Sequence, residues 1–581
     1  MCIYIYLNTI INFKTLNYNY IFLFKIIILL YINMTGGLMN LVAYGSENLL
    51  FNGNPKKTFF KATYQKYSNF GLQRFRIDYE GTKSLNLKTN TILDFKIPRY
   101  AEMLHDTYLV INLPNIYSPF YNYDTETSPP DKNGHEFAPY EFKWIEELGT
   151  NMIEEINIYS GGTTLAKYSG EYLNCLKERD FDTTKKNLWN RMTGNIKEIN
   201  DPDNSHGNIN TYPNTQHTDD SLDPEPSIRG RQLFIPIDAF FCDSSKMALP
   251  LVALQYQEIS IRIELKPVMD LYTINNVEET PSNNGLSYRM RPNKNILHHE
   301  MWRFLQAPKD EKATTSKYNQ NIIDWNADIH LMGTYIFLGQ AERRIFAAQE
   351  HKILIKQVYE YNFLDVNGSR IVEIESKDMV NNYMWRFRRS DAYLRNEWSN
   401  YTNWPYQNII PQSLQAFNML PNPANHFITG NIGNSTNNYP INLKEIMIDL
   451  GITMDGVYRE KVLPSGVYEY MEKYMRTTGG AKDGLYVYNF CLDSNKRTYQ
   501  PSGAMNVNKF KKVFFEFNTI DAPLDISGSN IEYICDLNGN AIGFRKSVAQ
   551  LNEYSYDLKI FEERYNIMMI QGGRVGLMNA R

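Results

Sequence analysis

The stretch that decides the fold reads EISIRIEL, at residues 258–265. Aliphatic side chains alternate with polar ones along it, and the aliphatic ones are Ile259, Ile261, Ile263 and Leu265. Successive side chains of a β-strand point to opposite faces of its sheet, so this pattern predicts a strand with one buried and one wetter face. Such a strand is typical of a β-sandwich.

Similar short segments recur along the chain, each bounded by Gly, Pro, Asn or Asp, whereas long amphipathic helical patterns are scarce. A first set lies at residues 91–98, 107–113, 152–159, 232–237 and 258–265. A second set lies at 329–338, 353–358, 371–375, 384–388, 445–453, 484–492, 512–518, 531–536 and 554–570. The two sets predict a mainly β chain with two sandwiches in tandem.

Long polar segments separate and flank these strands. We expect surface loops at residues 121–140, 198–229 and 403–440, which are poor in apolar side chains or rich in Asn and Pro. Residues 268–317 lie between the two strand sets and are the expected linker. This places the first domain at 58–267 and the second domain, with the C-terminal tail, at 318–581.

The first 33 residues differ from the rest, because they contain no Asp, Glu, Gly, Ala, Ser, Pro, Val or Arg. Their apolar run at 21–32 contains Lys25 and is shorter than the roughly 18 residues that a membrane-spanning helix needs. We therefore expect translation to begin at Met34, with residues 1–33 a non-structural extension and 34–57 an N-terminal arm. A short membrane-associating segment is the alternative.

Charge and cysteine content narrow the classes of function. The 581 residues include 60 Lys and Arg against 64 Asp and Glu, a formal net charge of −4. This balance argues against a dedicated nucleic-acid-binding protein, which concentrates positive charge. The five cysteines form no CxxC pair, which predicts buried free thiols in a reducing compartment; they are Cys2, Cys175, Cys242, Cys491 and Cys535.

The chain shows no motif for catalysis, cofactor binding or metal binding. The nine histidines form no HExxH or HxH pattern, and no GxSxG sequence occurs. Residues 477–484 are rich in Gly, but Lys482 is not followed by the Ser or Thr of a phosphate-binding loop, so we expect a turn there. We assign no catalytic residue, no cofactor and no metal site, and we expect the protein not to be an enzyme.

The densest basic and aromatic patch reads YMWRFRRSDAYLRNEW, at residues 383–398. Interleaved cations and rings of this kind can bind single-stranded nucleic acid. On a strand, however, Arg386 and Arg388 point to one face while Trp385 and Phe387 point to the other. This favours a core face backed by a charged face. Ion pairs from these arginines to a neighbouring subunit are a further alternative.

Several spaced motifs carry a resemblance to a known family. They are GGLMNLVAYG at 36–45, ALPLVALQYQE at 248–258, ERRIFA at 342–347, DGLYVYNF at 483–490 and QPSGAMN at 500–506. In this order they resemble the major capsid proteins of nucleocytoplasmic large DNA viruses, in particular those of mimivirus-like and phycodnavirus-like giant viruses. The sequence departs from the family pattern at Gln257, where His is usual, and at 242–246, which lack the usual Asn-Pro turn.

The resemblance implies a double jelly roll, that is, two tandem eight-stranded antiparallel β-sandwiches. It also implies a structural major capsid protein whose homotrimers form pseudo-hexagonal capsomers in an icosahedral virion, after assembly in the host cytoplasm. The implied partners are neighbouring capsomers, minor capsid proteins and a penton protein, with an underlying internal membrane left open and no direct nucleic-acid contact. Two alternatives remain: a capsid-related transient scaffold on a viral membrane, and a carbohydrate-binding β-sandwich.

Overall fold

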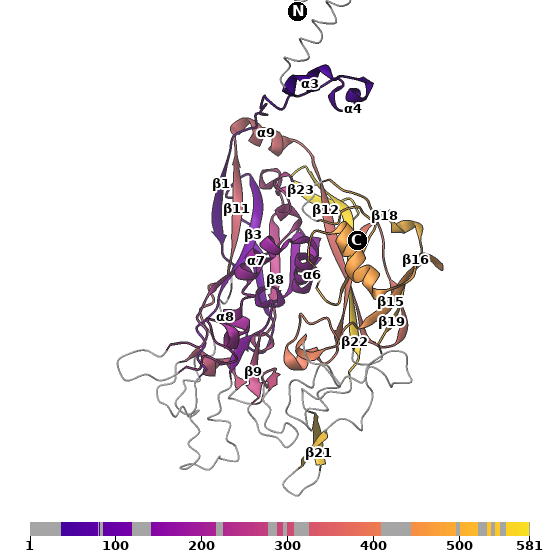
Figure 1. The fold of residues 1–581 in the computed structure, drawn as a ribbon. Coiled ribbons are helices and arrows are strands. Elements are labelled where there is room, and N and C mark those ends of the chain that lie inside the picture. The colour runs from indigo at the N-terminus through magenta and orange to yellow at the C-terminus, as the bar shows by residue number, and fades with distance from the viewer. Residues whose placement is uncertain are drawn as a thin grey trace, which may run out of the picture. The chain divides into compact units, whose positions relative to one another are not determined.

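The computed structural model describes residues 36–79, 81, 85–118, 141–215, 225–276, 288–293, 295, 299–306, 325–407, 443–480, 482–495, 500–520, 531–535, 541–546 and 554–579. The chain divides into two compact units, Met1–Ser68 and Asn69–Arg581. The described part of the first unit contains the short helices α3 (Gly36–Val42), η1 (Ser46–Asn48) and α4 (Leu49–Asn52). The expected extension at 1–33 lies outside the described residues and stays a prediction. The second unit holds both sandwiches (Figure 1).

In the part of the chain that the structure describes, eight strands form the first sandwich. One sheet has the order β1 (Phe70–Ile77), β11 (His330–Leu338), β3 (Met103–Asn112) and β7 (Gln232–Pro236). The other has the order β2 (Thr91–Lys96), β8 (Ile259–Leu265), β5 (Ile153–Ser160) and β6 (Thr163–Tyr168). All neighbouring strands in both sheets are antiparallel.

Eight further strands form the second sandwich. One sheet has the order β12 (His351–Val366), β22 (Tyr556–Gln571), β14 (Met379–Arg389) and β17 (Leu485–Asn489), and the short strands β18 (Met505–Asn506) and β23 (Arg574–Leu577) pair with it. The other has the order β13 (Ser369–Ile374), β19 (Val513–Thr519), β15 (Met447–Met454) and β16 (Val457–Pro464). A separate hairpin joins β20 (Ile531–Cys535) to β21 (Ala541–Lys546).

The two sandwiches have the same topology. When the eight strands of each are numbered along the chain, both give one sheet of order 1-8-3-6 and one of order 2-7-4-5. In each sandwich the last strand therefore lies between the first and the third. The double jelly roll that the sequence predicts is confirmed, and it is one topology used twice.

Strand β11 corrects the expected domain boundary. The segment at 329–338 was assigned to the second domain, but β11 pairs with β1 and β3 of the first roll. The expected linker at 268–317 also contributes β9 (Tyr272–Asn276), which pairs with β10 (Tyr288–Met290) and β4 (Phe142–Trp144). A strand that pairs with strands far earlier in the chain carries no local sequence signal that identifies its partners. The chain passes to the second roll through α9 (Gln340–Ala348).

The strands five and six of each roll are joined through helices that the sequence analysis missed. In the first roll they are α6 (Gly170–Asp180), α7 (Thr183–Thr193) and α8 (Lys197–Asn200), so part of the expected loop at 198–229 is helical. In the second they are η14 (Val467–Met471) and α11 (Glu472–Arg476). Capping groups begin the longer ones, because Ser169 and Asp182 accept hydrogen bonds from the first turns of α6 and α7. Across the described residues, no helix is long and apolar enough to span a membrane.

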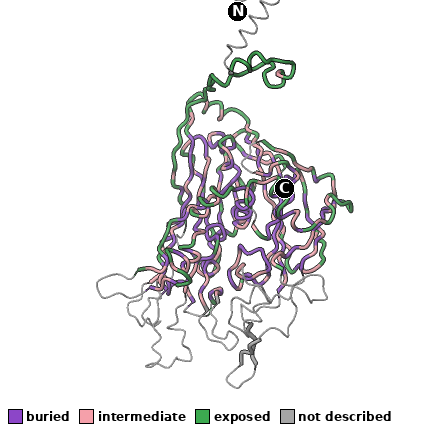
Figure 2. The backbone as a smooth tube through the Cα atoms, in the orientation of Figure 1, coloured by how far each residue is buried: buried purple, intermediate pink, exposed green. Residues whose placement is uncertain are grey.

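Buried residues run through both rolls (Figure 2), and among the described residues most of their apolar side chains form two large cores. The aliphatic face of β8 lies in the first core, with Ile259, Ile261, Ile263 and Leu265 at most 2% exposed, as the alternation predicts. The second core lies between the two sheets of the second roll. The first core also includes side chains from the outer face of the second roll, among them Met384, Phe561 and Ile570. The two rolls are therefore packed against each other through apolar surface.

Candidate functional site

Many buried polar side chains lie where the two rolls meet. We call this region the seam, and it consists of α6 from the first roll together with the facing side chains of β14 and β22 from the second. Ten of the eleven residues of α6 are buried. A helix that is mainly polar and yet covered on nearly all sides has to be held by specific partners on each side.

The first roll holds α6 by close packing at its beginning. Helix α5 (Leu148–Asn151) lies against this end, and a Cβ atom at Gly170 would lie 2.0 Å from the carbonyl oxygen of Thr150. Only glycine fits there, because every other residue would collide with backbone that cannot move aside. Asn174, one turn later, donates a hydrogen bond to the Oδ1 atom of Asn151 at 3.2 Å.

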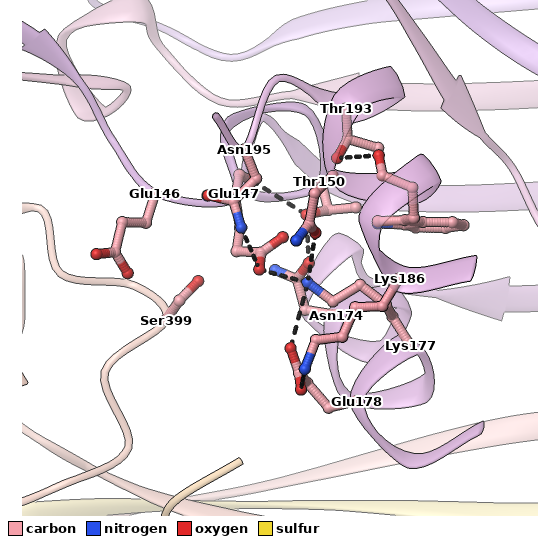
Figure 3. A network of polar contacts seen from close by, with 12 residues as sticks. Glu146, Glu147, Thr150, Asn174, Lys177, Glu178, Lys186, Thr193, Asn195 and Ser399 are labelled. Carbon is pink, nitrogen blue, oxygen red and sulfur yellow. Dashed lines mark hydrogen bonds and ion pairs between the residues drawn. The ribbon is translucent and has the colours of Figure 1, made fainter. Parts of the chain in front are cut away.

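Buried ion pairs continue this attachment along α6 (Figure 3). Lys177 is fully buried and pairs with Glu147, which precedes α5. Glu178 pairs with Lys186 of the neighbouring helix α7. Figure 3 shows these groups pointing toward one another between the helices, with Asn195 also contacting Glu147. The side of α6 that faces its own roll is thus fixed by charged groups that satisfy one another.

On the opposite side, Glu171 anchors α6 to the second roll. Its carboxylate accepts two hydrogen bonds from Arg386, at 2.6 and 3.0 Å, in a bidentate pair. Arg388 lies 3.3 Å and Lys559 3.4 Å from the same carboxylate. Burial alone would raise the pKa of Glu171, but these three cations hold it well below its usual range. The group is therefore an ionised carboxylate, 13% exposed and surrounded by three cations.

A second anchor lies at the end of α6 around Glu563, whose side chain is completely buried. Arg179 lies 2.9 Å away, and the hydroxyl of Tyr172 and the amide of Asn382 each donate a hydrogen bond at 2.7 Å. Burial would raise the pKa of Glu563, but Arg179, the charge of Lys356 and these donors lower it to about 2. Arg179 also makes a bidentate pair with Asp180, at 2.7 and 2.9 Å. Glu563 and Asp180 thus share the positive charge of Arg179.

Apolar and backbone contacts complete the seam. The rings of Tyr172 and Phe561 lie 5.8 Å apart, and the amide of Gly479 donates a hydrogen bond to the carbonyl oxygen of Arg179 at 2.7 Å. A Cβ atom at 479 would lie 2.4 Å from that backbone, so the Gly-rich segment at 477–484 allows close approach to α6. Cys175 lies inside the seam, where burial raises the pKa of its thiol to about 12. This geometry holds two domains at one angle and presents no reactive group to solvent.

The basic and aromatic patch at 383–398 is partly as the sequence predicts. Trp385 and Phe387 are 0% exposed in the second core, and Arg386 and Arg388 lie on the other face of β14, which confirms the alternation. These two arginines pair with Glu171 of the same chain, so the alternative of pairing with a neighbouring subunit is wrong for them. The face is charged but covered, which leaves it inaccessible to nucleic acid.

The seam residues Glu171, Arg179 and Glu563 were not identified from the sequence. Their partners lie far along the chain, and in local sequence Glu563 is only half of an acidic pair. Among the described residues, no group of three or more His, Cys, Asp or Glu could hold a metal ion. Cys175, Cys242 and Cys491 are free thiols. Cys2 and the side chain of Cys535 lie outside the described part of the chain.

Known proteins resemble this chain over most of its length. The major capsid protein of Chrysochromulina ericina virus is 26% identical over 344 residues, which cover 56% of this chain and 52% of the relative. That of Phaeocystis pouchetii virus is 24% identical over 328 residues, 56% of this chain and 53% of the relative. The chain thus spans about half the length of these two curated relatives. The major capsid protein of Paramecium bursaria Chlorella virus 1 is 21% identical over 548 residues, 94% of this chain and 100% of the relative.

Solved structures share the fold. The PBCV-1 protein VP54 superimposes with a TM-score of 0.57 at 16% identity, covering 90% of this chain and 100% of that one. The Faustovirus major capsid protein gives a TM-score of 0.54 at 12% identity, with 89% and 93% covered. At these identities the likeness establishes the double jelly-roll fold.

Two family models divide the chain where its topology divides. The model described as "Major capsid protein N-terminus" matches residues 58–338, and that described as "Large eukaryotic DNA virus major capsid protein" matches 342–576. The break between them falls between the end of β11 and the first turn of α9, where the first roll ends. Because each model accounts for one complete jelly roll, the chain belongs to the major capsid proteins of large eukaryotic DNA viruses.

Proposed function

We propose that this protein builds the shell of a large DNA virus, and that three copies form a pseudo-hexagonal capsomer. The observation that carries the proposal is the repeated topology, because two rolls with identical strand orders lie in one chain. A threefold ring of such chains has six similar corners, which lets it pack as a hexagon. The family membership and the names of the relatives support the same role.

The seam gives this proposal a physical basis. A tile with six similar corners requires a constant angle between the two rolls, and a flexible connection would not provide it. In the seam, the ion pairs of Glu171 and Glu563 and the close contact of Gly479 with Arg179 fix that angle. Breaking a buried ion pair of this kind costs about 3–5 kcal/mol, so the rolls move as one body.

The remaining assignments belong to the same proposal. We divide the chain into jelly rolls at α9, and we place the protein in the virion capsid after assembly in the host cytoplasm, for which the free thiols at Cys175, Cys242 and Cys491 are suited. Its partners are two further copies, neighbouring capsomers, minor capsid proteins and a penton protein, above an internal membrane where one is present. The role is geometric and needs no catalytic turnover.

The test is the solution mass of the full chain, measured by light scattering coupled to size exclusion at dilute concentration. We expect three times the chain mass of 67.9 kDa, and pseudo-hexagonal particles in electron micrographs. A folded monomer would refute intrinsic assembly, and binding on a glycan array would then favour the carbohydrate-binding alternative. Low abundance in purified virions would favour the scaffold alternative.

A further inference from the structure

The two rolls share a helix as well as a strand order. The sequence SGEYLNCLKERD at 169–180 comprises the N-cap Ser169 and all of α6, and SGVYEYMEKYMR at 465–476 covers η14 and α11. Ser, Gly, Tyr and Lys recur at the same positions of both segments, which are 296 residues apart. The shared lysines, Lys177 and Lys473, are 0% and 3% exposed and both face their own roll. The two helices are therefore structural equivalents.

Their outward sides differ in what covers them. In α6, Cys175 and Arg179 are 0% exposed because the second roll lies over them. The equivalent positions in the second roll are Met471 and Met475, which are 62% and 71% exposed. The neighbouring side chains Tyr470 and Tyr474 are 48% and 87% exposed. We call these four side chains the outer helix face. A cluster of large exposed side chains of this kind marks an interaction surface, and methionine adapts well to a partner.

The surface that would receive this face is also present twice. Helix α6 sits on the outer side of the sheet β12-β22-β14-β17, where the paired residues Met384 and Phe561 are 0% exposed beneath the first roll. The equivalent sheet of the first roll is β1-β11-β3-β7. There the equivalent strands pair Tyr108 with Met332, both only half-buried, and Leu72 on the adjoining strand is 59% exposed.

We propose that the outer helix face of one copy packs on the β1-β11-β3-β7 sheet of the next copy, and so repeats the seam between chains. The inference rests on the proposed trimer and identifies its interface. A second copy is the occupant because each chain already makes the same helix-on-sheet contact once internally. Three chains contain six rolls. Around the ring, the seam within a chain would alternate with the proposed contact between chains. The ring closes at three chains when each contact rotates one roll relative to the next by about 60°.

The chemistry of the two contacts fits this division. Glu171 and Arg179, which are charged in the internal seam, are replaced by Val467 and Met475 at the equivalent positions of the second helix. Val467 and Met475 therefore bring no charge of their own into a contact between separate chains. The outer helix face is thus suited to a partner that arrives after folding.

The test compares the full chain with the double substitution Met471→Glu and Met475→Glu. We expect the dissociation constant of the trimer to rise by roughly 100-fold, with an unchanged circular dichroism spectrum because both side chains are exposed. The matched control is Leu364→Glu with Ile371→Glu, whose side chains are 74% and 64% exposed on the same roll, and it should remain trimeric. Trimers formed equally well by both variants would overturn the interface and leave the proposed function standing. A monomeric unmodified chain would overturn both.

A second measurement identifies the receiving surface without a charge in the interface. The full chain carrying Met475→Cys and Leu72→Cys is treated with a short bismaleimide and run on a denaturing gel. We expect bands of two and three linked chains, which should be absent when Leu364→Cys replaces Met475→Cys. A trimer that gives no linked chains from the first pair would show that the outer helix face packs elsewhere.

Discussion

The charge of Glu563 provides a direct measure of how strongly the seam couples the rolls. The substitution Glu563→Gln keeps the size of the side chain but removes the anion that lies 2.9 Å from Arg179. Tyr172 and Asn382 donate to different oxygens of the carboxylate, so the single amide oxygen of Gln can accept from only one of them. The folded-state pKa of about 2 lies below the ordinary value of 4.5. This difference corresponds to about 3 kcal/mol of stability at neutral pH. The cost of breaking a buried ion pair, about 3–5 kcal/mol, agrees with it.

The same pKa fixes the dependence on pH. Because the pKa of Glu563 is lowered by folding, its contribution is fully present above pH 4.5 and is lost as the pH falls toward 2. The difference in unfolding free energy between the native chain and Glu563→Gln should therefore shrink from about 3 kcal/mol at pH 7 to about 1.5 kcal/mol at pH 3.

Urea unfolding followed by tryptophan fluorescence at one fixed protein concentration measures this difference. The control is Glu373→Gln, since that carboxylate is 48% exposed beside Lys512 and its loss should change the free energy by less than about 0.5 kcal/mol. A difference below about 1 kcal/mol for Glu563→Gln at pH 7, or one that does not change with pH, would show that the buried pair does not stabilise the seam.

Three further predictions concern the same helix. Gly170→Ala places a Cβ atom 2.0 Å from the carbonyl oxygen of Thr150, so we expect a loss of more than about 3 kcal/mol in urea unfolding; a stability within about 1 kcal/mol of the native chain would contradict the close packing. Glu171→Gln leaves Arg386 buried without its anion and should make the connection at 339–350 sensitive to limited proteolysis, whereas an unchanged digestion pattern would mean that the rolls stay coupled without it. Because burial raises the pKa of the Cys175 thiol to about 12, Ellman's reagent at pH 8 should label Cys175 only after urea is added. In the variant Cys175→Ser, one thiol fewer should react in urea. Rapid labelling of Cys175 in the native state would contradict its burial.

Local alternation predicts a strand well where one of its faces is buried. The pattern of β8 is of this kind, and so are the rings and arginines on the two faces of β14. Strand β1 shows the opposite case, because most of its residues are exposed and it lies at the edge of its sheet, which leaves no apolar alternation to detect. The position of a strand within a sheet is harder still. Strand β11 follows the long segment after β8, and its pairing with β1 and β3 shows that it belongs to the first roll.

The seam could not be predicted, because its interactions join residues distant in sequence. Arg179 and Glu563 are 384 positions apart, and Glu171 and Arg386 are 215 apart. In local sequence each of these residues resembles an ordinary solvated charge, and 124 charged residues offer many other pairings. Gly170 can be read from the sequence, but the reason that only glycine fits there is the carbonyl group of Thr150 on another helix. What the sequence did carry was the family resemblance, and this implied the two rolls without the contacts that join them.

The contrast between the two helices follows from when each contact forms. The internal seam joins parts of one chain, so its formation loses no translational freedom, and it can include the several buried charges around Glu171 and Glu563 that specify one angle. A contact between chains has to offset an estimated 4–15 kcal/mol of lost translational and rotational freedom, and desolvating charges would add to that. The apolar outer helix face, with Met471 and Met475, avoids this cost. A duplicated jelly roll thus uses one geometry twice, with charges where the angle is set inside a chain and apolar side chains where separate chains associate.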